Sequence, residues 1–478
     1  MINVQEQVAR TTKSLIFQEP FYGLFLIGIN KKYTESIPTA GVSKNNIGMQ
    51  LTINPQFYFE LSEDHRYGLI KHELLHIAFG HLLTRDLYGD KKLFNIAADL
   101  EINQYINSSK LPDGGLLLSS FPELDLPIKA GTDKYYELLQ QARQDGTCPS
   151  LDNLMNQIKN LSLIGIFMAF VVIALGAWTR LVDAGLGCPD WPGCYGFVFW
   201  PNDEAEIALA ESRFPMFPYD INKAIPEQVH RLFAASLGLL AIILVYLSFN
   251  KTNNKSMQRW SAFLLLLICC QGLFGYLTVS LKLLPIIVTI HLFGGFATLT
   301  LLYFIYLKSR NFEILNQMNI SGLKTIAAIA MLVLILQIFL GVWTSTNYAS
   351  LACADFPTCQ GSYIPEMDFK SGFNLNQEVG PNYLYGLLDN PARVAIHYSH
   401  RISALFVTLI FLILMSRLWF SDAAPLASTL GILLLTQITL GIINVVYVLP
   451  LYVAIAHNLV AACLLLAMFT VNYLAWKK

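Results

Sequence analysis

The sequence predicts a mainly α-helical protein, in which a polytopic membrane bundle of eight helices follows a smaller soluble α+β domain. Hydrophobic residues make up 54% of the 478 residues and charged residues only 14%, whereas soluble chains are about a quarter charged. The distribution is also uneven, because residues 1–152 contain frequent charges and turn signals while long apolar runs dominate the remainder. The formal net charge of −1 gives no reason to expect a nucleic-acid partner.

The soluble domain, residues 1–152, contains no apolar run of the ~20 residues that span a membrane. Its candidate site is the segment His72-Glu73-Leu-Leu-His76. The i,i+4 spacing puts both histidines on one helix face, as in zinc proteases, with Glu73 as the general base for a zinc-bound water. The third ligand is either His81 or Asp99. The alternative is an amphipathic helix with incidental histidines.

Eight apolar segments are long enough to span a membrane. They lie near residues 161–179, 228–249, 260–280, 284–307, 323–344, 392–416, 426–447 and 450–475. Basic residues cluster after the second, fourth and sixth segments and at the end of the chain, namely Lys251, Lys255, Arg259, Lys308, Arg310, Arg417, Lys477 and Lys478. The positive-inside rule therefore predicts that these breaks and both termini are cytoplasmic and that the loops 180–227 and 345–391 face outward.

An internal repeat divides the membrane region into two four-helix units, residues 153–310 and 311–478. The first and fifth segments end in Leu-Gly-x-Trp-Thr, at Gly176 and Gly341. Each glycine is followed by the pattern Cys-x-Asp-x-Pro-x-Cys-x-Gly, then by a His-Arg pair and by a stretch that runs from a glutamine to a proline. Two tandem copies of one unit are the simplest explanation.

The repeat places one histidine near the start of each even-numbered segment: His230, His291, His400 and His457. Ionisable residues inside a membrane are costly and usually functional. Two imidazoles per unit match the axial ligands of a six-coordinate haem, whereas zinc would need further ligands. The alternative is a set of hydrogen-bonded core histidines. Arg231 and Arg401 are candidate partners of haem propionates. Alternatively, these two side chains extend to the lipid headgroups.

The two units differ three residues before the first histidine, where unit one has Glu227 and unit two has His397. The i,i+3 spacing puts each of them on the face of its histidine. A carboxylate beside only one haem site suggests that one unit performs chemistry and the other holds a cofactor. The alternative for Glu227 is a surface residue stabilised by the helix dipole.

Two cysteine pairs lie in the predicted outward loops, where disulfides persist. The short spacing predicts the bridges Cys188–Cys194 and Cys353–Cys359. A structural role and a redox role as a dithiol pair both remain open.

Residues from about 158 to 478 resemble the heme A synthase family. The resemblance rests on the segments Gly176–Arg180, Cys188–Cys194, Glu227–Arg231 and Gln271–Gly275 and on the four spaced histidines. It implies a membrane oxidoreductase that oxidises a methyl group of haem O to the formyl group of haem A. It further implies that His230 and His291 hold the substrate, that His400 and His457 hold a haem b cofactor, and that Glu227 is the catalytic carboxylate.

The resemblance also implies a heme O synthase as supplier, a membrane electron acceptor and a location in the bacterial plasma membrane. The oligomeric state does not follow from it.

Residues 1–152 resemble the N-terminal part of a family of metallopeptidases that contain HExxH and usually continue into a von Willebrand A-type domain. The resemblance implies a zincin-like fold and a zinc ion, and it covers the HExxH helix and the helix of Asp99. This chain continues into the membrane region instead, so we expect the peptidase-like domain to be truncated.

Three functions therefore compete at this point. The leading one is synthesis of haem A. The others are electron transfer by a membrane protein with two bis-histidine haems and hydrolysis by a membrane-anchored zinc metallopeptidase.

Overall fold

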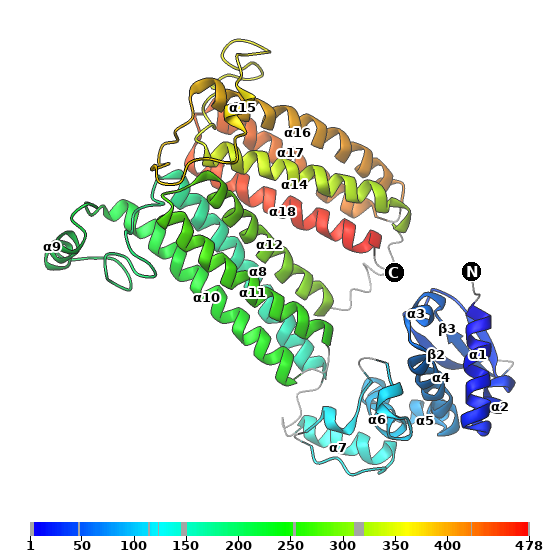
Figure 1. The fold of residues 1–478 in the computed structure, drawn as a ribbon. Helices are drawn as coiled ribbons and strands as arrows, with labels where there is room; N and C mark the ends of the chain where they lie inside the picture. The colour runs from blue at the N-terminus through cyan, green and yellow to red at the C-terminus, as the bar shows by residue number, and fades with distance from the viewer. Residues whose placement is uncertain are drawn as a thin grey trace. The chain divides into compact units, whose positions relative to one another are not determined.

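The computed structural model describes residues 4–45, 48–112, 115–122, 124–144, 151–251, 255–309, 320–421 and 423–476. Arg310, Lys477 and Lys478, which contribute to the predicted topology, lie outside these residues. The chain divides into two compact units (Figure 1). The soluble unit consists mainly of residues 1–154, and the membrane unit consists of residues 155–250 and 257–477.

The soluble unit combines helices with a small mixed sheet. Its main elements are α1 (Val4–Gln18), α2 (Pro20–Gly28), β1 (Asn30–Tyr33), β2 (Ala40–Asn45), β3 (Gly48–Ile53), α3 (Pro55–Glu60), α4 (Glu63–Ala78), α5 (His81–Thr84), α6 (Lys91–Ile102) and α7 (Thr132–Gln144). The strand order is β1-β3-β2, with β1 parallel and β2 antiparallel to β3. The α+β composition predicted for this part of the chain is confirmed.

Helix α4 carries the HExxH segment, and local sequence fixes both of its ends. The Ser62 hydroxyl accepts a hydrogen bond from the backbone amide of His65 at 3.2 Å and caps the N-terminus. After the helix, Gly80 adopts a left-handed conformation with φ +73°, which suits glycine because it has no Cβ. The chain turns there, and α5 begins at His81.

Helix α4 is also closely packed along its length, at Gly68. A Cβ atom at Gly68 would lie 1.9 Å from the carbonyl oxygen of Lys110, so only glycine fits. Lys110 ends a short 3-10 helix, Ser108–Lys110, a few residues beyond α6. The contact at Gly68 therefore holds the segment that follows α6 against the HExxH helix.

Among its described residues, the membrane unit contains eight helices that are long and apolar enough to cross a bilayer. They are α8 (Leu151–Leu181), α10 (Ile221–Lys251), α11 (Lys255–Ser280), α12 (Pro285–Ser309), α14 (Lys324–Thr346), α16 (Asn390–Trp419), α17 (Ala424–Val446) and α18 (Leu451–Trp476). All eight predicted spans are confirmed. Helix α10 begins seven residues before the predicted apolar segment, because hydropathy detects only the apolar part of a helix that continues through polar residues.

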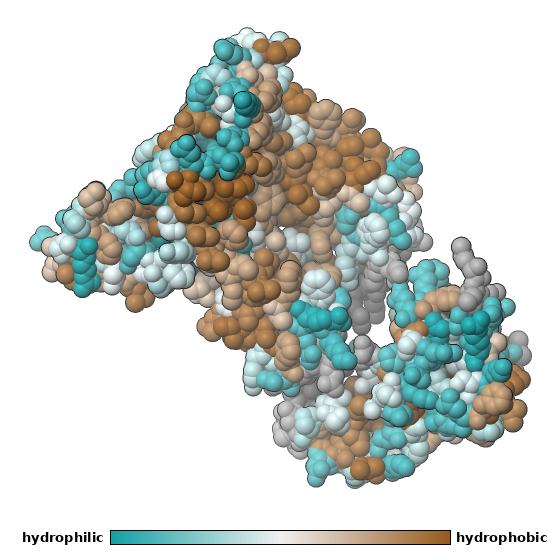
Figure 2. Space-filling model, viewed as in Figure 1, coloured by the Kyte–Doolittle hydropathy of each residue, from teal (hydrophilic) through white to brown (hydrophobic). Residues whose placement is uncertain are grey.

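The eight helices form two bundles of four, α8 with α10–α12 and α14 with α16–α18 (Figure 1). One hydrophobic core runs through both bundles, from Ile158 in α8 to Ala475 in α18. Apolar side chains also cover much of the visible outer surface of these helices (Figure 2). Among the most exposed are Leu239, Leu332 and Leu405. An apolar exterior is expected of helices in contact with lipid acyl chains.

The two loops that carry the cysteine pairs have the same local structure. Disulfides join Cys188 to Cys194 and Cys353 to Cys359, with Cα–Cα distances of 4.7 and 4.6 Å. In the first loop the Asp190 carboxylate accepts hydrogen bonds from the amides of Tyr195 and Gly196 at 2.6 and 2.8 Å.

Asp355 plays the same part in the second loop, where it accepts from the amides of Gln360 and Gly361 at 2.6 and 2.9 Å. Hydrogen bonds from the Thr358 hydroxyl and these amides lower the pKa of Asp355 to about 2. The repeated Cys-x-Asp-x-Pro-x-Cys-x-Gly pattern thus encodes a turn held by an aspartate.

We predict that Gly68→Ala loosens α4, because the new methyl group overlaps a backbone carbonyl. Overpacking of this kind typically costs about 1–3 kcal/mol. Hydrogen exchange of α4 peptides, measured by mass spectrometry on the full chain, should speed up by about 5- to 150-fold. Gly28→Ala is the control, because a Cβ there meets nothing within 4 Å. Unchanged exchange in Gly68→Ala would show that the contact does not hold α4.

Candidate functional site

Each of the four repeat histidines packs against a glycine of a neighbouring helix. A Cβ on the glycine would lie 3.0 Å from Cε1 of the histidine for Gly176–His230 and Gly341–His400, 3.3 Å for Gly441–His457 and 3.5 Å for Gly275–His291. The glycines occupy equivalent positions in the two repeats. They therefore determine how closely each imidazole approaches the adjacent helix.

The structure brings His230 and His291 together in the first bundle. Their ring centroids are 6.4 Å apart and their planes are perpendicular. Metal–imidazole bonds of about 2.0–2.1 Å would put two rings on opposite sides of one metal at about 6.3 Å between centroids. Nδ1 of His230 lies 3.1 Å from the carbonyl oxygen of Val172. A proton on Nδ1 leaves the Nε2 lone pair available, so this pair fits the axial ligands of a haem iron.

His400 and His457 occupy the corresponding positions in the second bundle, on α16 and α18. Each lies beside a glutamine: Nε2 of Gln337 is 3.1 Å from Nδ1 of His400, and Nε2 of Gln437 is 3.1 Å from Nε2 of His457. Nδ1 of His457 is buried and has no hydrogen-bond partner among the described residues. The glycine contacts match those of the first bundle, but the polar neighbours differ, since Nδ1 of His400 faces an amide nitrogen where Nδ1 of His230 faces a carbonyl oxygen. The two imidazoles are the kind of ligand that a haem iron takes.

Glu227 lies at the end of the first bundle next to the disulfide loop and is only 4% exposed. One carboxylate oxygen accepts from the backbone amide of Cys188 at 3.0 Å, and the other forms an ion pair with Arg231. The same arginine donates to the carbonyl oxygens of Asp190 and Gly193 at 2.8 and 2.7 Å. Glu227 and Arg231 together therefore attach the first disulfide loop to the helix of His230.

Arg401 makes the equivalent attachment in the second bundle. It donates to the carbonyl oxygens of Cys353, Asp355 and Thr358 at 2.7–2.9 Å. His397, which replaces the glutamate, accepts from Nε of Arg401 at 3.2 Å, and its Nδ1 lies 3.1 Å from the Ala349 carbonyl oxygen. Both ring nitrogens of His397 thus have protein partners.

The contacts of Arg231 and Arg401 with loop carbonyls are a feature that sequence reasoning missed. The repeated His-Arg pair predicted equivalent roles for the two arginines, but it did not identify the loop as their partner. Pairing of these arginines with propionates stays a prediction.

Sequence reasoning also missed a contact between the two bundles. Arg180, at the end of α8, donates to the carbonyl oxygen of Ser345 at the end of α14. Its guanidinium lies 3.7 Å from the ring centroid of Tyr348. The Tyr348 hydroxyl donates to Asp183 at 2.8 Å, and Asp183 is 3.4 Å from Arg180. This triad joins the ends of α8 and α14, and no motif in the second repeat marks it.

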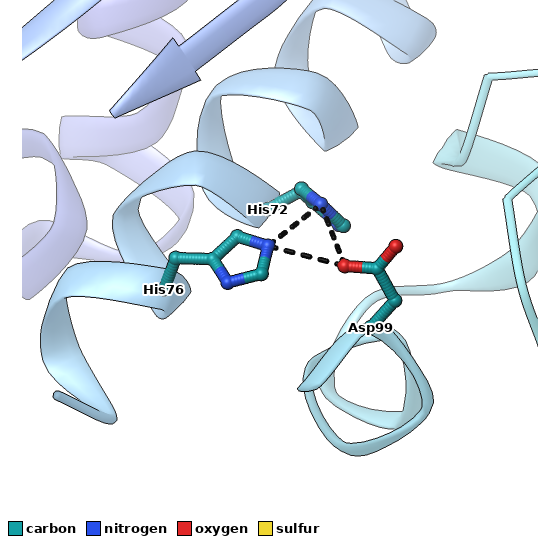
Figure 3. A group of neighbouring side chains, drawn as sticks. All are labelled: His72, His76 and Asp99. Atoms are coloured by element: carbon teal, nitrogen blue, oxygen red, sulfur yellow. Dashed lines mark hydrogen bonds and ion pairs between the residues drawn. The ribbon is translucent and has the colours of Figure 1, made fainter. Parts of the chain in front are cut away.

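A second site lies in the soluble unit, where His72 and His76 of α4 face Asp99 of α6 (Figure 3). Nε2 of His76 is 3.1 Å from Nε2 of His72 and 3.2 Å from Oδ1 of Asp99, and the third distance is 3.6 Å. Tetrahedral zinc with bonds of about 2.0–2.1 Å places its ligand atoms about 3.3–3.4 Å apart. The three atoms therefore fit one zinc ion.

Glu73 lies on the same helix, α4, and is only 7% exposed. Burial raises the pKa of Glu73 to about 6, with Asp99 raising it further, and His72 and the backbone of Val42 acting in the opposite direction. A carboxylate with a pKa near neutrality beside a candidate metal site suits a general base.

Asp99 and His81, the two candidates for the third ligand, occupy different places. Asp99 lies beside both histidines of α4, whereas His81 lies behind His76, with its Nδ1 3.0 Å from Nδ1 of His76. Asn103 lies behind His72 in the same way, with Oδ1 2.8 Å from Nδ1. Sequence reasoning did not single out Asn103, although it follows Asp99 by one helical turn.

Two protein families match the chain. The family described as "Cytochrome oxidase assembly protein" matches residues 159–469. The family described as "Putative metallopeptidase domain" matches residues 4–160. The two matches meet where the soluble unit gives way to the first membrane helix.

Curated relatives match the membrane part of the chain. A heme A synthase of Shewanella oneidensis is 42% identical over 324 residues, which cover 67% of this chain and 98% of that protein. A heme A synthase of Rickettsia prowazekii is 28% identical over 332 residues, covering 65% of this chain and 95% of that protein. One of Rickettsia africae is 27% identical over 328 residues, covering 63% and 93%.

Proposed function

Because the chain belongs to the family of cytochrome oxidase assembly proteins, we propose that its membrane unit is a heme A synthase. The enzyme is an oxidoreductase that converts one methyl group of haem O into the formyl group of haem A. The observation that carries this proposal is the 42% identity to a heme A synthase across 98% of that protein's length. Eight apolar helices and the facing rings of His230 and His291 agree with it.

The overall reaction requires an electron acceptor. Conversion of a methyl group and one water into a formyl group releases four electrons and four protons. We propose that the methyl group is hydroxylated in successive steps and then loses water, and that a membrane component accepts the electrons. A heme O synthase is the proposed supplier of the substrate.

We assign the substrate to the first bundle, residues 153–310, with haem O held between His230 and His291. Glu227 is the proposed catalytic carboxylate, because it precedes His230 by three residues and is held in place by Cys188 and Arg231. It would act as general base or stabilise positive charge that develops on the substrate.

We assign a haem b cofactor to the second bundle, residues 311–478, between His400 and His457. When bound there, haem b would supply one-electron redox chemistry. This bundle has the neutral His397 where the first has Glu227, which is the basis for giving the two sites different roles.

The proposed location is the bacterial plasma membrane, with both termini in the cytoplasm. Lys255, Arg259, Lys308 and Arg417 lie at the helix ends opposite the disulfide loops, as the positive-inside rule requires. Disulfides in the outward loops agree with an oxidising exterior.

We predict that Glu227→Gln blocks haem A formation while bound haem is retained, because the amide keeps the shape of the carboxylate but not its charge or basicity. The full chain would be expressed in a host that makes haem O but not haem A, and extracted haems resolved by chromatography and mass. Wild type should yield haem A, and the variant at least ~100-fold less. The control is Glu204→Gln, on the exposed loop helix α9 (Glu204–Arg213).

Normal haem A formation in Glu227→Gln would remove the catalytic role. Wild-type chain that binds haem but yields only haem O would favour the alternative of a dihaem electron-transfer protein.

We predict that Gly341→Leu reduces haem b content several-fold, because the new side chain would press on the imidazole of His400. The measurement is pyridine haemochrome absorbance per mole of purified protein. Gly272→Leu is the matched control, since Gly272 is exposed on α11 and a Cβ there meets nothing within 4 Å. Equal haem content in both variants would contradict the assignment of this site.

A second function is proposed for the soluble unit, that of a zinc-dependent peptidase. The convergence of His72, His76 and Asp99 at zinc-like distances is the observation that favours it. Zinc would activate a water molecule when bound there, and Glu73 would accept its proton.

We predict that Glu73→Gln abolishes peptide hydrolysis but retains bound zinc, because Glu73 is not among the three converging ligands. Hydrolysis of a quenched fluorescent peptide library and zinc content by elemental analysis are the two readouts. Glu63→Gln, exposed at the start of the same helix, is the control. Hydrolysis that persists unchanged in Glu73→Gln would contradict the peptidase proposal.

A further inference from the structure

The soluble unit contains polar side chains behind the zinc ligands that the proposed hydrolysis does not use. His81 is 5% exposed, Asn103 is 2% exposed, and the side chain of Glu101 is 13% exposed. Burying a polar group lowers the stability of the fold unless the group is hydrogen-bonded. The partners of these three residues, called here the supporting residues, indicate their role.

We propose that the supporting residues His81, Glu101 and Asn103 fix the proton positions of His72 and His76 and thereby raise the affinity of the soluble unit for zinc. This inference rests on the zinc site proposed above. It adds a positioning role for residues that are themselves not ligands.

The first part of the argument concerns His72. Asn103 donates through Nδ2 to the carbonyl oxygen of Leu116 at 2.8 Å, so its Oδ1 is the atom directed at Nδ1 of His72. An oxygen acceptor at 2.8 Å requires the proton of His72 to be on Nδ1. Nε2 is then unprotonated, and it is the atom that faces His76 and Asp99.

The second part concerns His76, whose Nε2 also faces the cluster. Its Nδ1 lies 3.0 Å from Nδ1 of His81, so one of these two nitrogens donates to the other. Nε2 of His81 lies 3.0 Å from the hydroxyl oxygen of Thr132, whose own proton goes to Glu101. Nε2 therefore carries the proton of His81, and Nδ1 of His81 accepts from Nδ1 of His76. Thr132 in turn donates to Oε2 of Glu101 through both its hydroxyl and its amide.

The hydrogen bonds from His76 to His81, to Thr132 and to Glu101 therefore run in one direction and end on a carboxylate. Histidine ligands of zinc commonly donate their second N–H to a carboxylate or carbonyl, which orients the ring and makes it a better ligand. Here an intervening histidine and threonine extend that connection.

The arrangement also explains why the cluster would attract a cation. With both Nδ1 atoms protonated, two imidazole lone pairs and one carboxylate oxygen converge within 3.6 Å of one another. Three acceptors at such distances repel each other unless a positive charge lies between them. Asn103 and His81 favour this state, because each accepts a hydrogen bond from the Nδ1 proton of one ligand histidine, and Glu101 fixes the proton of His81 through Thr132.

The test measures zinc affinity of the purified full chain by equilibrium dialysis against buffered Zn²⁺, with zinc counted by mass spectrometry. His81→Leu and Asn103→Leu should each weaken binding about 10- to 100-fold. His81→Asn keeps an acceptor near Nδ1 of His76 and should recover part of that loss. Glu101→Gln should weaken binding less than His81→Leu does.

Two controls separate this role from general destabilisation. His65→Leu, on the same helix α4, should bind zinc as the wild type does. Hydrogen exchange of α4 in the zinc-free variants should match the wild type. If affinity falls only in variants whose zinc-free α4 exchanges faster, the supporting residues are merely structural and the inference is overturned.

The remaining outcomes distinguish the two proposals. Wild-type chain that binds zinc while His81→Leu, Asn103→Leu and Glu101→Gln bind it equally well would overturn the inference alone. Wild-type chain that binds no more zinc than Asp99→Leu would overturn the zinc site and the inference together. A graded loss with partial recovery in His81→Asn would support both.

Discussion

A histidine inside an apolar helix bundle must be held by its neighbours, because no bulk water solvates it there. In the membrane unit, glycines on neighbouring helices leave room for the histidines. Each admits one imidazole against the backbone of an adjacent helix, and the same contact recurs four times across the two repeats. The spacing of each histidine pair, the helices that carry the pair and the small residues at those crossings are thus aspects of one packing arrangement.

The sequence alone predicted the features that depend on hydropathy and on repetition. Eight apolar runs gave the eight helices, and the duplicated cysteine pattern gave the two loops with their disulfides. Apolar runs are local and the cysteine pattern is repeated, so both can be recognised without knowledge of tertiary contacts. The helix of Glu227 began earlier than hydropathy indicated, because its first turns are polar.

Partners that depend on tertiary packing could not be predicted in the same way. His81 and Asp99 were equally acceptable as third ligands in sequence, since the choice depends on how α6 packs on α4. Arg231 and Arg401 directly follow His230 and His400, so the sequence suggested that they bind haem propionates. In the structure, several of their N–H groups donate to carbonyl oxygens of the disulfide loops. Backbone acceptors of this kind leave no mark on the sequence.

The attachment of each loop by an arginine has a consequence for how the two repeats could diverge. The guanidinium makes its hydrogen bonds to the loop through main-chain carbonyls, which every amino acid provides. The neighbouring position can therefore be an acid in one copy, Glu227, and a neutral ring in the other, His397, while the loop keeps its shape. After duplication of an ancestral half, such an architecture lets natural selection specialise one copy without rebuilding the other.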